Sequence, residues 1–232
     1  DALINSYEIA PIQYDVILID EGQDFKPEYW LAIEMLRVQQ EDTKLYIFQD
    51  SNQAIYTDSN DLPINCESLF LFDNCRNTKY IHNSAYQYYK GTEVDAPDLE
   101  GEPVQLIEEM SLELQARAID KKILGLINTE NINPEDIAII VMGSFHEAQA
   151  LLSNTNNSHL WAFKEFSPTS KVLVETEKRF KGLEAKIIFL WIIDEKAIND
   201  KSLYVSISRA RFRLWVIGTT PIIKITNLMK FT

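Results

Sequence analysis

Short apolar runs alternate with helical patterns along most of the chain, and this alternation constrains the fold more than any other feature. The runs are too short for helices and rich in β-branched residues, as in strands buried within a parallel sheet. Strands are expected at 16–19, 44–48, 69–72, 104–107, 137–142, 172–174, 187–193 and 214–217. Helices are expected at 27–39, 78–89, 112–127 and 145–153, and helical turns between the last three strands. The alternation predicts βαβ units and an α/β fold with a mainly parallel sheet.

A domain boundary is expected near residue 65, because residues 57–68 form a polar connection. The part before it holds only two expected strands and one helix. That is too little to close a hydrophobic core. We therefore expect residues 1–65 to be the C-terminal remnant of a domain that begins upstream, and residues 66–232 to form a complete second domain.

The formal net charge of −13 argues against a protein that coats nucleic acid by bulk electrostatics. Basic clusters at 178–181 and 209–213 remain as local patches or as solvated surface. No apolar run is long enough to cross a bilayer, so no membrane partner is expected. Cys66 and Cys75 form no CxxC pair, which favours a reducing, cytoplasmic location, and Cys75 is expected to be a small buried side chain.

The segment VILIDEGQDF (16–25) ends an expected buried strand in two adjacent carboxylates, Asp20 and Glu21. Carboxylates at the carboxyl end of such a strand suit a divalent ion and a general base, and in P-loop NTPases one of them holds Mg²⁺. A solvated acidic turn is the alternative for these residues taken alone. With Asp24 as a third carboxylate, a Mg²⁺-dependent hydrolase that works without ATP is a further, weaker alternative.

Other polar segments follow later in the chain. Gln53, beyond the second expected strand, is suited to orient a water or touch a terminal phosphate. Arg76 and Arg209 are candidates for stabilising phosphoryl charge, and Gly182 allows a tight turn beside Glu184. For each of them an ordinary loop or surface residue is the alternative.

Taken together and in order, these segments resemble the motifs of UvrD/Rep-like superfamily-one helicases. VILIDEGQDF resembles the Walker B motif (motif II), QDSNQAIY motif III, NCRN motif IV, TEKRFKGLEA motif V and YVSISRAR motif VI. The resemblance runs from about residue 14 to 218. It implies a RecA-like parallel-sheet P-loop NTPase fold, with a complete second RecA-like domain preceded by the tail of the first.

The resemblance also implies ATP and Mg²⁺ as cofactors. Asp20 would ligate Mg²⁺ and Glu21 would activate the attacking water. Gln53 would sense the γ-phosphate, while Arg76 and Arg209 would be arginine fingers. Together these residues would form a catalytic centre for phosphoryl transfer.

The remaining matched positions concern the nucleotide sugar and the nucleic acid. By resemblance Glu184 would contact the sugar, and Gly182 would shape the loop beside it. Tyr56 and Thr176 fall where the family touches single-stranded DNA, by base stacking and by a hydroxyl bond to phosphate. Lys178 replaces the usual histidine of motif V and would bind phosphate as a point charge.

Departures from the family pattern limit the expected activity. Gln49 and Ala54 replace the glycine and serine of motif III, and no Gly-Lys-Ser or Gly-Lys-Thr of a P-loop occurs in the sequence. We expect a C-terminal helicase fragment that does not hydrolyse ATP alone and whose partners are single-stranded DNA and the missing N-terminal RecA-like domain. A catalytically inactive helicase-like module that binds a protein partner is the alternative.

The aromatic and histidine side chains outside these motifs are expected to be structural. Tyr86, Tyr88 and Tyr89 cluster on an expected helix without interleaved basic residues, which favours packing over base stacking. The histidines are scattered and none has metal-ligand spacing.

Overall fold

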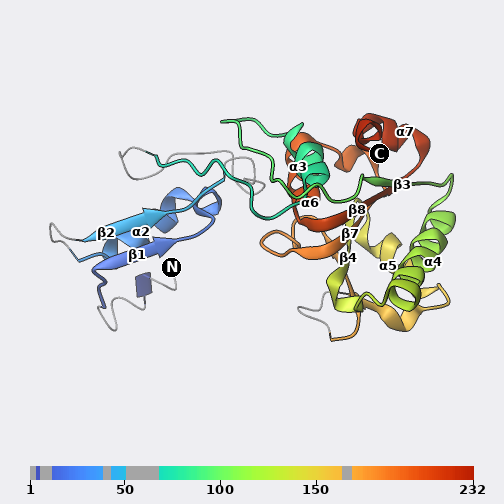
Figure 1. The fold of residues 1–232 in the computed structure, drawn as a ribbon. Coiled ribbons are helices and arrows are strands. Elements are labelled where there is room, and N and C mark those ends of the chain that lie inside the picture. Colours follow the sequence, from blue (N-terminus) through green and yellow to red (C-terminus); the bar gives the residue numbers. More distant parts are fainter. Residues whose placement is uncertain (1–3, 6–11, 39–42, 51–67, 164–168) are drawn as a thin grey trace. The chain divides into compact units, whose positions relative to one another are not determined.

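The computed structural model describes residues 4–5, 12–38, 43–50, 68–163 and 169–232 (Figure 1). The chain separates into two compact units, Asp1–Phe70 and Leu71–Thr232. Gln53 and Tyr56 lie outside the described residues, so their predicted roles stay predictions.

The described part of the first unit contains a parallel strand pair and a helix that connects its two strands. Strands β1 (Val16–Ile19) and β2 (Lys44–Ile47) pair in parallel, and α2 (Pro27–Met35) connects them with its proline in the first turn. The helix ends four residues before the predicted end at Gln39. It ends early because the chain turns to pair with Tyr14, whose backbone bonds the carbonyl of Leu36 and the N–H of Val38.

The second unit is built on a six-stranded, all-parallel sheet, which confirms the predicted α/β RecA-like class. The strand order across the sheet is β3-β8-β7-β4-β6-β5. The strands are β3 (Gln105–Glu108), β4 (Ile137–Met142), β5 (Trp161–Phe163), β6 (Val172–Thr176), β7 (Ala185–Ile192) and β8 (Ala210–Gly218). Every residue of β4 is buried, as expected for a central strand covered on both faces.

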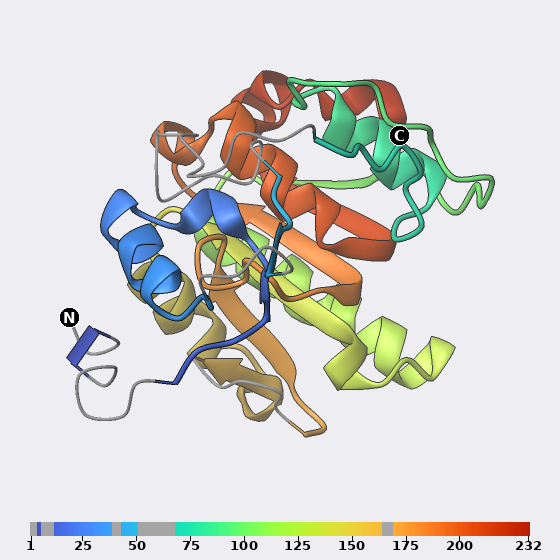
Figure 2. The same ribbon diagram turned by 90° about the vertical axis from the view of Figure 1, so that its left-hand side faces the viewer.

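Helices cover both faces of this sheet (Figures 1 and 2). On one face lie α4 (Leu112–Glu130) and α5 (Phe145–Ser153). On the other lie α3 (Lys79–Tyr86), α6 (Asp200–Ser208) and α7 (Thr220–Ile225). None of the helices in the described parts of the chain has the length and apolar character that a membrane span requires.

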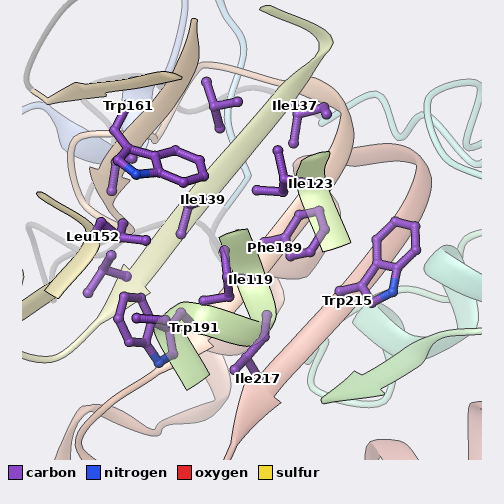
Figure 3. Packing of buried hydrophobic residues seen from close by; sticks show 14 of the residues in the cluster. Ile119, Ile123, Ile137, Ile139, Leu152, Trp161, Phe189, Trp191, Trp215 and Ile217 are labelled. Carbon is purple, nitrogen blue, oxygen red and sulfur yellow. The ribbon is translucent and has the colours of Figure 1, made fainter. Parts of the chain in front are cut away.

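The core beneath α4 combines aliphatic and aromatic side chains (Figure 3). Ile119 and Ile123 of α4 pack with Ile139 of β4, and each such side chain contributes about 1.5–3 kcal/mol when fully buried. The indole N–H of Trp191 donates to the side-chain oxygen of Gln115 at 2.7 Å. That hydrogen bond satisfies a polar group that would be costly to bury alone.

The opposite face is packed by tyrosines at the end of α3 and just beyond it. The rings of Tyr86 and Tyr89 lie 5.8 and 5.4 Å from the ring of Tyr204 on α6. The hydroxyl of Tyr88 donates to the carbonyl of Thr226. These contacts agree with the packing interpretation of the tyrosine cluster.

The predicted strand at 69–72 is wrong, because these residues form no strand. Leu69 and Leu71 are 97% and 84% exposed, and the nearest pairing is an isolated bridge between Asp73 and Asp95. A strand needs backbone hydrogen bonds to a neighbouring strand, and an apolar sequence by itself does not provide that neighbour.

Elements β5 and α7 are not predicted from the sequence, and only helical turns are expected where α6 lies. The sequence does not indicate the full length of α6 because seven of its nine residues are buried, so it lacks the polar face that produces a helical period. Its start is marked by Asn199, whose side chain accepts a hydrogen bond from the N–H of Ser202 at 2.9 Å.

Candidate functional site

In the first unit, the predicted carboxylates follow directly after β1. The Asp20 carboxylate is exposed and accepts a hydrogen bond from the Glu21 N–H at 2.9 Å. Glu21 has a φ of 54°, a left-handed conformation that is uncommon for a residue other than glycine. Its carboxylate accepts a hydrogen bond from the side chain of Gln23. The local backbone therefore turns sharply at the two acidic residues.

Gln23 is a site residue that the sequence analysis missed. Its side chain is buried, donates to Glu21 and accepts from the N–H of Asp50 at 3.0 Å. It thus joins the end of β1 to the segment after β2. The position of Gln23 in the sequence does not indicate this contact.

A carboxylate such as Asp20 fits Mg²⁺, because that ion is commonly held by one or two carboxylates together with water and substrate phosphates. One oxygen of the Asp20 carboxylate accepts from the N–H of Glu21, and a carboxylate offers about four acceptor positions in all. Among the described residues no three His, Cys, Asp or Glu side chains are grouped to hold a metal ion, and Asp20, Glu21 and Asp24 do not form such a group.

In the second unit, residues from three distant segments meet in an arginine–glutamate triad. The Nε of Arg76 lies 3.2 Å from one carboxylate oxygen of Glu184, and the Nη1 of Arg211 lies 3.3 Å from the other. The three side chains are between 42 and 46% exposed. The structure thus brings the predicted Arg76 and Glu184 together and adds Arg211, which the sequence placed only in the basic cluster at 209–213.

The loop that carries Arg76 is fixed by two asparagines. The side-chain oxygen of Asn74 accepts from the N–H of Arg76 at 2.9 Å, an arrangement typical of asparagine in turns. The Asn77 amide donates to the carbonyl of Ser208 at 3.0 Å and to that of Ala210. Asn77 therefore ties the loop that carries Arg76 to the segment between α6 and β8.

Cys75 lies in the same loop and is exposed, so the prediction that it is buried is wrong. The turn made by Asn74 and Arg76 presents the intervening residue to solvent.

His82 continues the asparagine network into α3. The amide nitrogen of Asn74 lies 2.9 Å from Nδ1 of His82, whose ring stacks on Tyr86 at 4.0 Å. An amide nitrogen only donates, so Nδ1 accepts and the imidazole is neutral. Burial lowers the pKa of His82, while a hydrogen bond to the Val94 backbone and the charge of Asp95 act in the opposite direction.

Arg209 takes a different position from Arg76. It is only 3% exposed, and its Nε donates to the carbonyl of Val205 at 3.2 Å. Its own carbonyl accepts from the N–H of Ala185 at 3.1 Å, which joins the start of β8 to the start of β7. The predicted role of Arg209 as an arginine finger stays a prediction, and Arg211 lies beside Glu184 instead.

Thr176 lies away from the triad, at the carboxyl end of β6. In the register of the sheet, Thr176 is paired with Val141 of β4, and Val141 is paired with Trp191 of β7. Trp191 lies six residues after Ala185, the first residue of β7. At about 3.3 Å per residue, this separates Thr176 from the start of β7 by about 20 Å along the strands.

The segment between Thr176 and Glu184 carries the remaining predicted residues. The hydroxyl of Thr176 accepts from the N–H of Arg179 at 3.4 Å, and Lys178 is exposed. Gly182 has a φ of +81°, so it makes the turn before Glu184 in a conformation that favours glycine. Burial raises the pKa of the Glu177 carboxyl, while a hydrogen bond from its own backbone and the charge of Lys178 act in the opposite direction.

Comparison with known proteins identifies the fold. No protein-family model and no curated protein matches the chain. Among solved structures, the C-terminal domain of a possible DNA helicase from Lactobacillus strain WCFS1 is similar, with a TM-score of 0.51 and 17% identity. The match covers 68% of this chain and 93% of that domain. At this identity the likeness shows a shared parallel-sheet architecture.

Proposed function

We propose that this chain is the C-terminal part of an ATP-dependent DNA helicase or translocase of the UvrD/Rep-like type. One observation carries the proposal: the segments that resemble motifs IV, V and VI converge in space. Arg76 contacts Glu184, and Asn77 bonds the backbone of Ser208 and Ala210. An accidental resemblance would not require residues so far apart in sequence to form one polar cluster. The helicase-domain neighbour supports the proposal through its fold.

In the proposed mechanism, the first unit supplies the acidic groups. Asp20 would hold Mg²⁺, which neutralises phosphate charge when bound, and Glu21 would take a proton from the attacking water. Asp20 suits its role because its carboxylate is exposed at a strand end. Gln23 would keep Glu21 oriented through its side-chain amide.

The second unit would supply cations and contacts to DNA. Arg76 and Arg209 would stabilise charge on the transferred phosphoryl group, and Glu184 would contact the nucleotide sugar. Thr176 and Lys178, on the far end of β6, would bind the phosphates of single-stranded DNA. The distance of about 20 Å along the strands between Thr176 and the start of β7 is compatible with separate surfaces for nucleotide and nucleic acid.

The test is ATP hydrolysis by a version of the protein extended upstream through a P-loop. We expect single-stranded DNA to stimulate hydrolysis, and Arg76→Ala or Arg209→Ala to lower kcat at least about 100-fold. Arg117→Ala, an exposed arginine on α4, is the matched control and should leave kcat unchanged. The proposal is contradicted if single-stranded DNA does not change the rate of ATP hydrolysis, or if hydrolysis continues when both arginines are replaced.

A helicase-like module that binds a protein partner without catalysis is the second candidate. The burial of Arg209 favours it, since its Nε is engaged by Val205 and it would have to move to reach a phosphate. An extended protein that folds but does not hydrolyse ATP with or without DNA would support this candidate over the first.

A further inference from the structure

Glu184 is bound on both carboxylate oxygens by arginines from different segments. Arg76 contacts Oε2 and Arg211 contacts Oε1, at 3.2 and 3.3 Å. Two guanidinium groups that converge on one anion match the way arginines bind a phosphate, which also offers several acceptor oxygens. The carboxylate of Glu184 thus stands where such a phosphate oxygen pair would be held.

These ion pairs are exchangeable. All three side chains are more than 40% exposed, and exposed ion pairs contribute little to stability because water competes for both partners. The triad holds two positive charges and one negative charge, so an excess of one positive charge remains. A phosphate group carries more negative charge than a carboxylate and is therefore a stronger ligand for the two arginines.

The backbones of both arginines would stay in place if Glu184 moved, because bonds that do not involve Glu184 fix them. The N–H of Thr78 donates to the carbonyl of Arg211 at 3.1 Å, directly beside the Arg76 loop. Asn77 bonds the carbonyls of Ser208 and Ala210. Opening the ion pairs therefore leaves both arginine backbones in place, so that only their side chains must order when an anion binds.

We propose that Arg76 and Arg211 form a phosphate-binding pair, and that Glu184 occupies the phosphate position until a polyphosphate displaces it. Arg211 thereby joins the site as a phosphate-contacting residue, and Glu184 acts as an internal competitor. That the natural ligand is a nucleoside triphosphate rests on the proposed function. Displacement of the carboxylate by phosphate does not, because it needs only the triad.

The experiment is calorimetric titration of the 232-residue chain with inorganic tripolyphosphate at low ionic strength. Arg76→Gln and Arg211→Gln should each weaken binding about tenfold, because each removes a charge-assisted contact. Glu184→Gln should tighten binding at least about threefold, because it removes the competing charge and keeps the side-chain shape. Arg117→Gln removes the same charge from α4 and should leave binding within about twofold of the wild type.

The outcomes separate this inference from the helicase proposal. Unchanged binding by Arg211→Gln, weaker binding by Glu184→Gln, or no binding by either the wild type or Glu184→Gln overturns the phosphate pair. Equal losses for Arg211→Gln and Arg117→Gln overturn it too, since they indicate attraction to net charge alone. Loss of DNA-stimulated ATP hydrolysis in the extended protein, with the titration results intact, overturns only the helicase proposal.

Discussion

Replacing Asn77 tests whether the site loops are joined as the structure indicates. The buried Asn77 amide donates to the carbonyls of Ser208 and Ala210, and its oxygen accepts from Asn74 at 3.0 Å. Asn77→Ala removes all three hydrogen bonds, at about 0.5–1.5 kcal/mol each, so we expect a loss of about 2–4 kcal/mol in unfolding free energy. Asn77→Asp keeps the shape but points an oxygen at two carbonyl oxygens, and should cost at least about 1 kcal/mol more at pH 7.

The aspartate variant also predicts a pH dependence. Burial and the facing carbonyls raise the pKa of the new carboxyl in the folded state above its unfolded value. Its ionisation is therefore opposed by folding, and the penalty shrinks as the pH falls and the protonated acid donates to a carbonyl. The alanine variant has no such group, so the gap between the two variants should close toward pH 4.

Urea unfolding followed by tryptophan fluorescence measures both effects. Trp30 lies in the first unit, so Trp30→Phe is used as a common background that leaves only the tryptophans of the second unit. Asn156→Ala, at an exposed turn position, is the control and should stay within about 0.5 kcal/mol. An aspartate variant as stable as the alanine variant at pH 7, or a gap between them that does not depend on pH, refutes the bonding assigned to Asn77.

Two further predictions concern stability. Because burial lowers the pKa of His82, the unfolded chain binds a proton more readily, so stability should fall as the pH drops below about 6.5 and level off below the folded-state pKa. In urea unfolding at several pH values, His82→Gln should remove most of this slope and the exposed His146→Gln should not; identical slopes contradict the neutral state of His82. Gly182→Ala should cost about 1–2 kcal/mol from its φ of +81° alone, since open space surrounds the added Cβ. Gly101→Ala should cost clearly more by the same measurement, because its Cβ would lie 2.4 Å from that of Thr78, and equal losses would show that the Thr78 contact relaxes without cost.

The fold class was predictable because parallel strands buried on both faces carry a strong local signal. The run at 137–142 is apolar throughout, and the structure buries all of it. The same rule failed at 69–72, where an equally apolar run has no neighbouring strand and stays exposed. Apolar content indicates that a segment suits a sheet, but pairing depends on a partner that lies elsewhere in the chain.

The candidate site was predictable only in part, because its motifs identify residue types and the fold decides which side chains meet. Arg76 and Glu184 were expected from the resemblance and do lie together. Arg211 was not expected, since its position follows from where β8 begins. Gln23 and Asn77 were missed for a related reason: each acts through backbone groups, which a sequence does not mark.

In the triad region, one set of bonds fixes the backbone and a different set holds the charged side chains. The backbone positions depend on buried hydrogen bonds, such as those from Asn77, which water does not readily replace. The charged ends of Arg76, Glu184 and Arg211 depend on exposed ion pairs, which are weak and screened by salt. A site arranged in this way can release its internal carboxylate without loosening the loops that aim its arginines. It follows that Asn77→Ala should weaken tripolyphosphate binding even though both arginines are still present, because their loops are no longer held. Added salt should also weaken binding, but without lowering the free energy of unfolding.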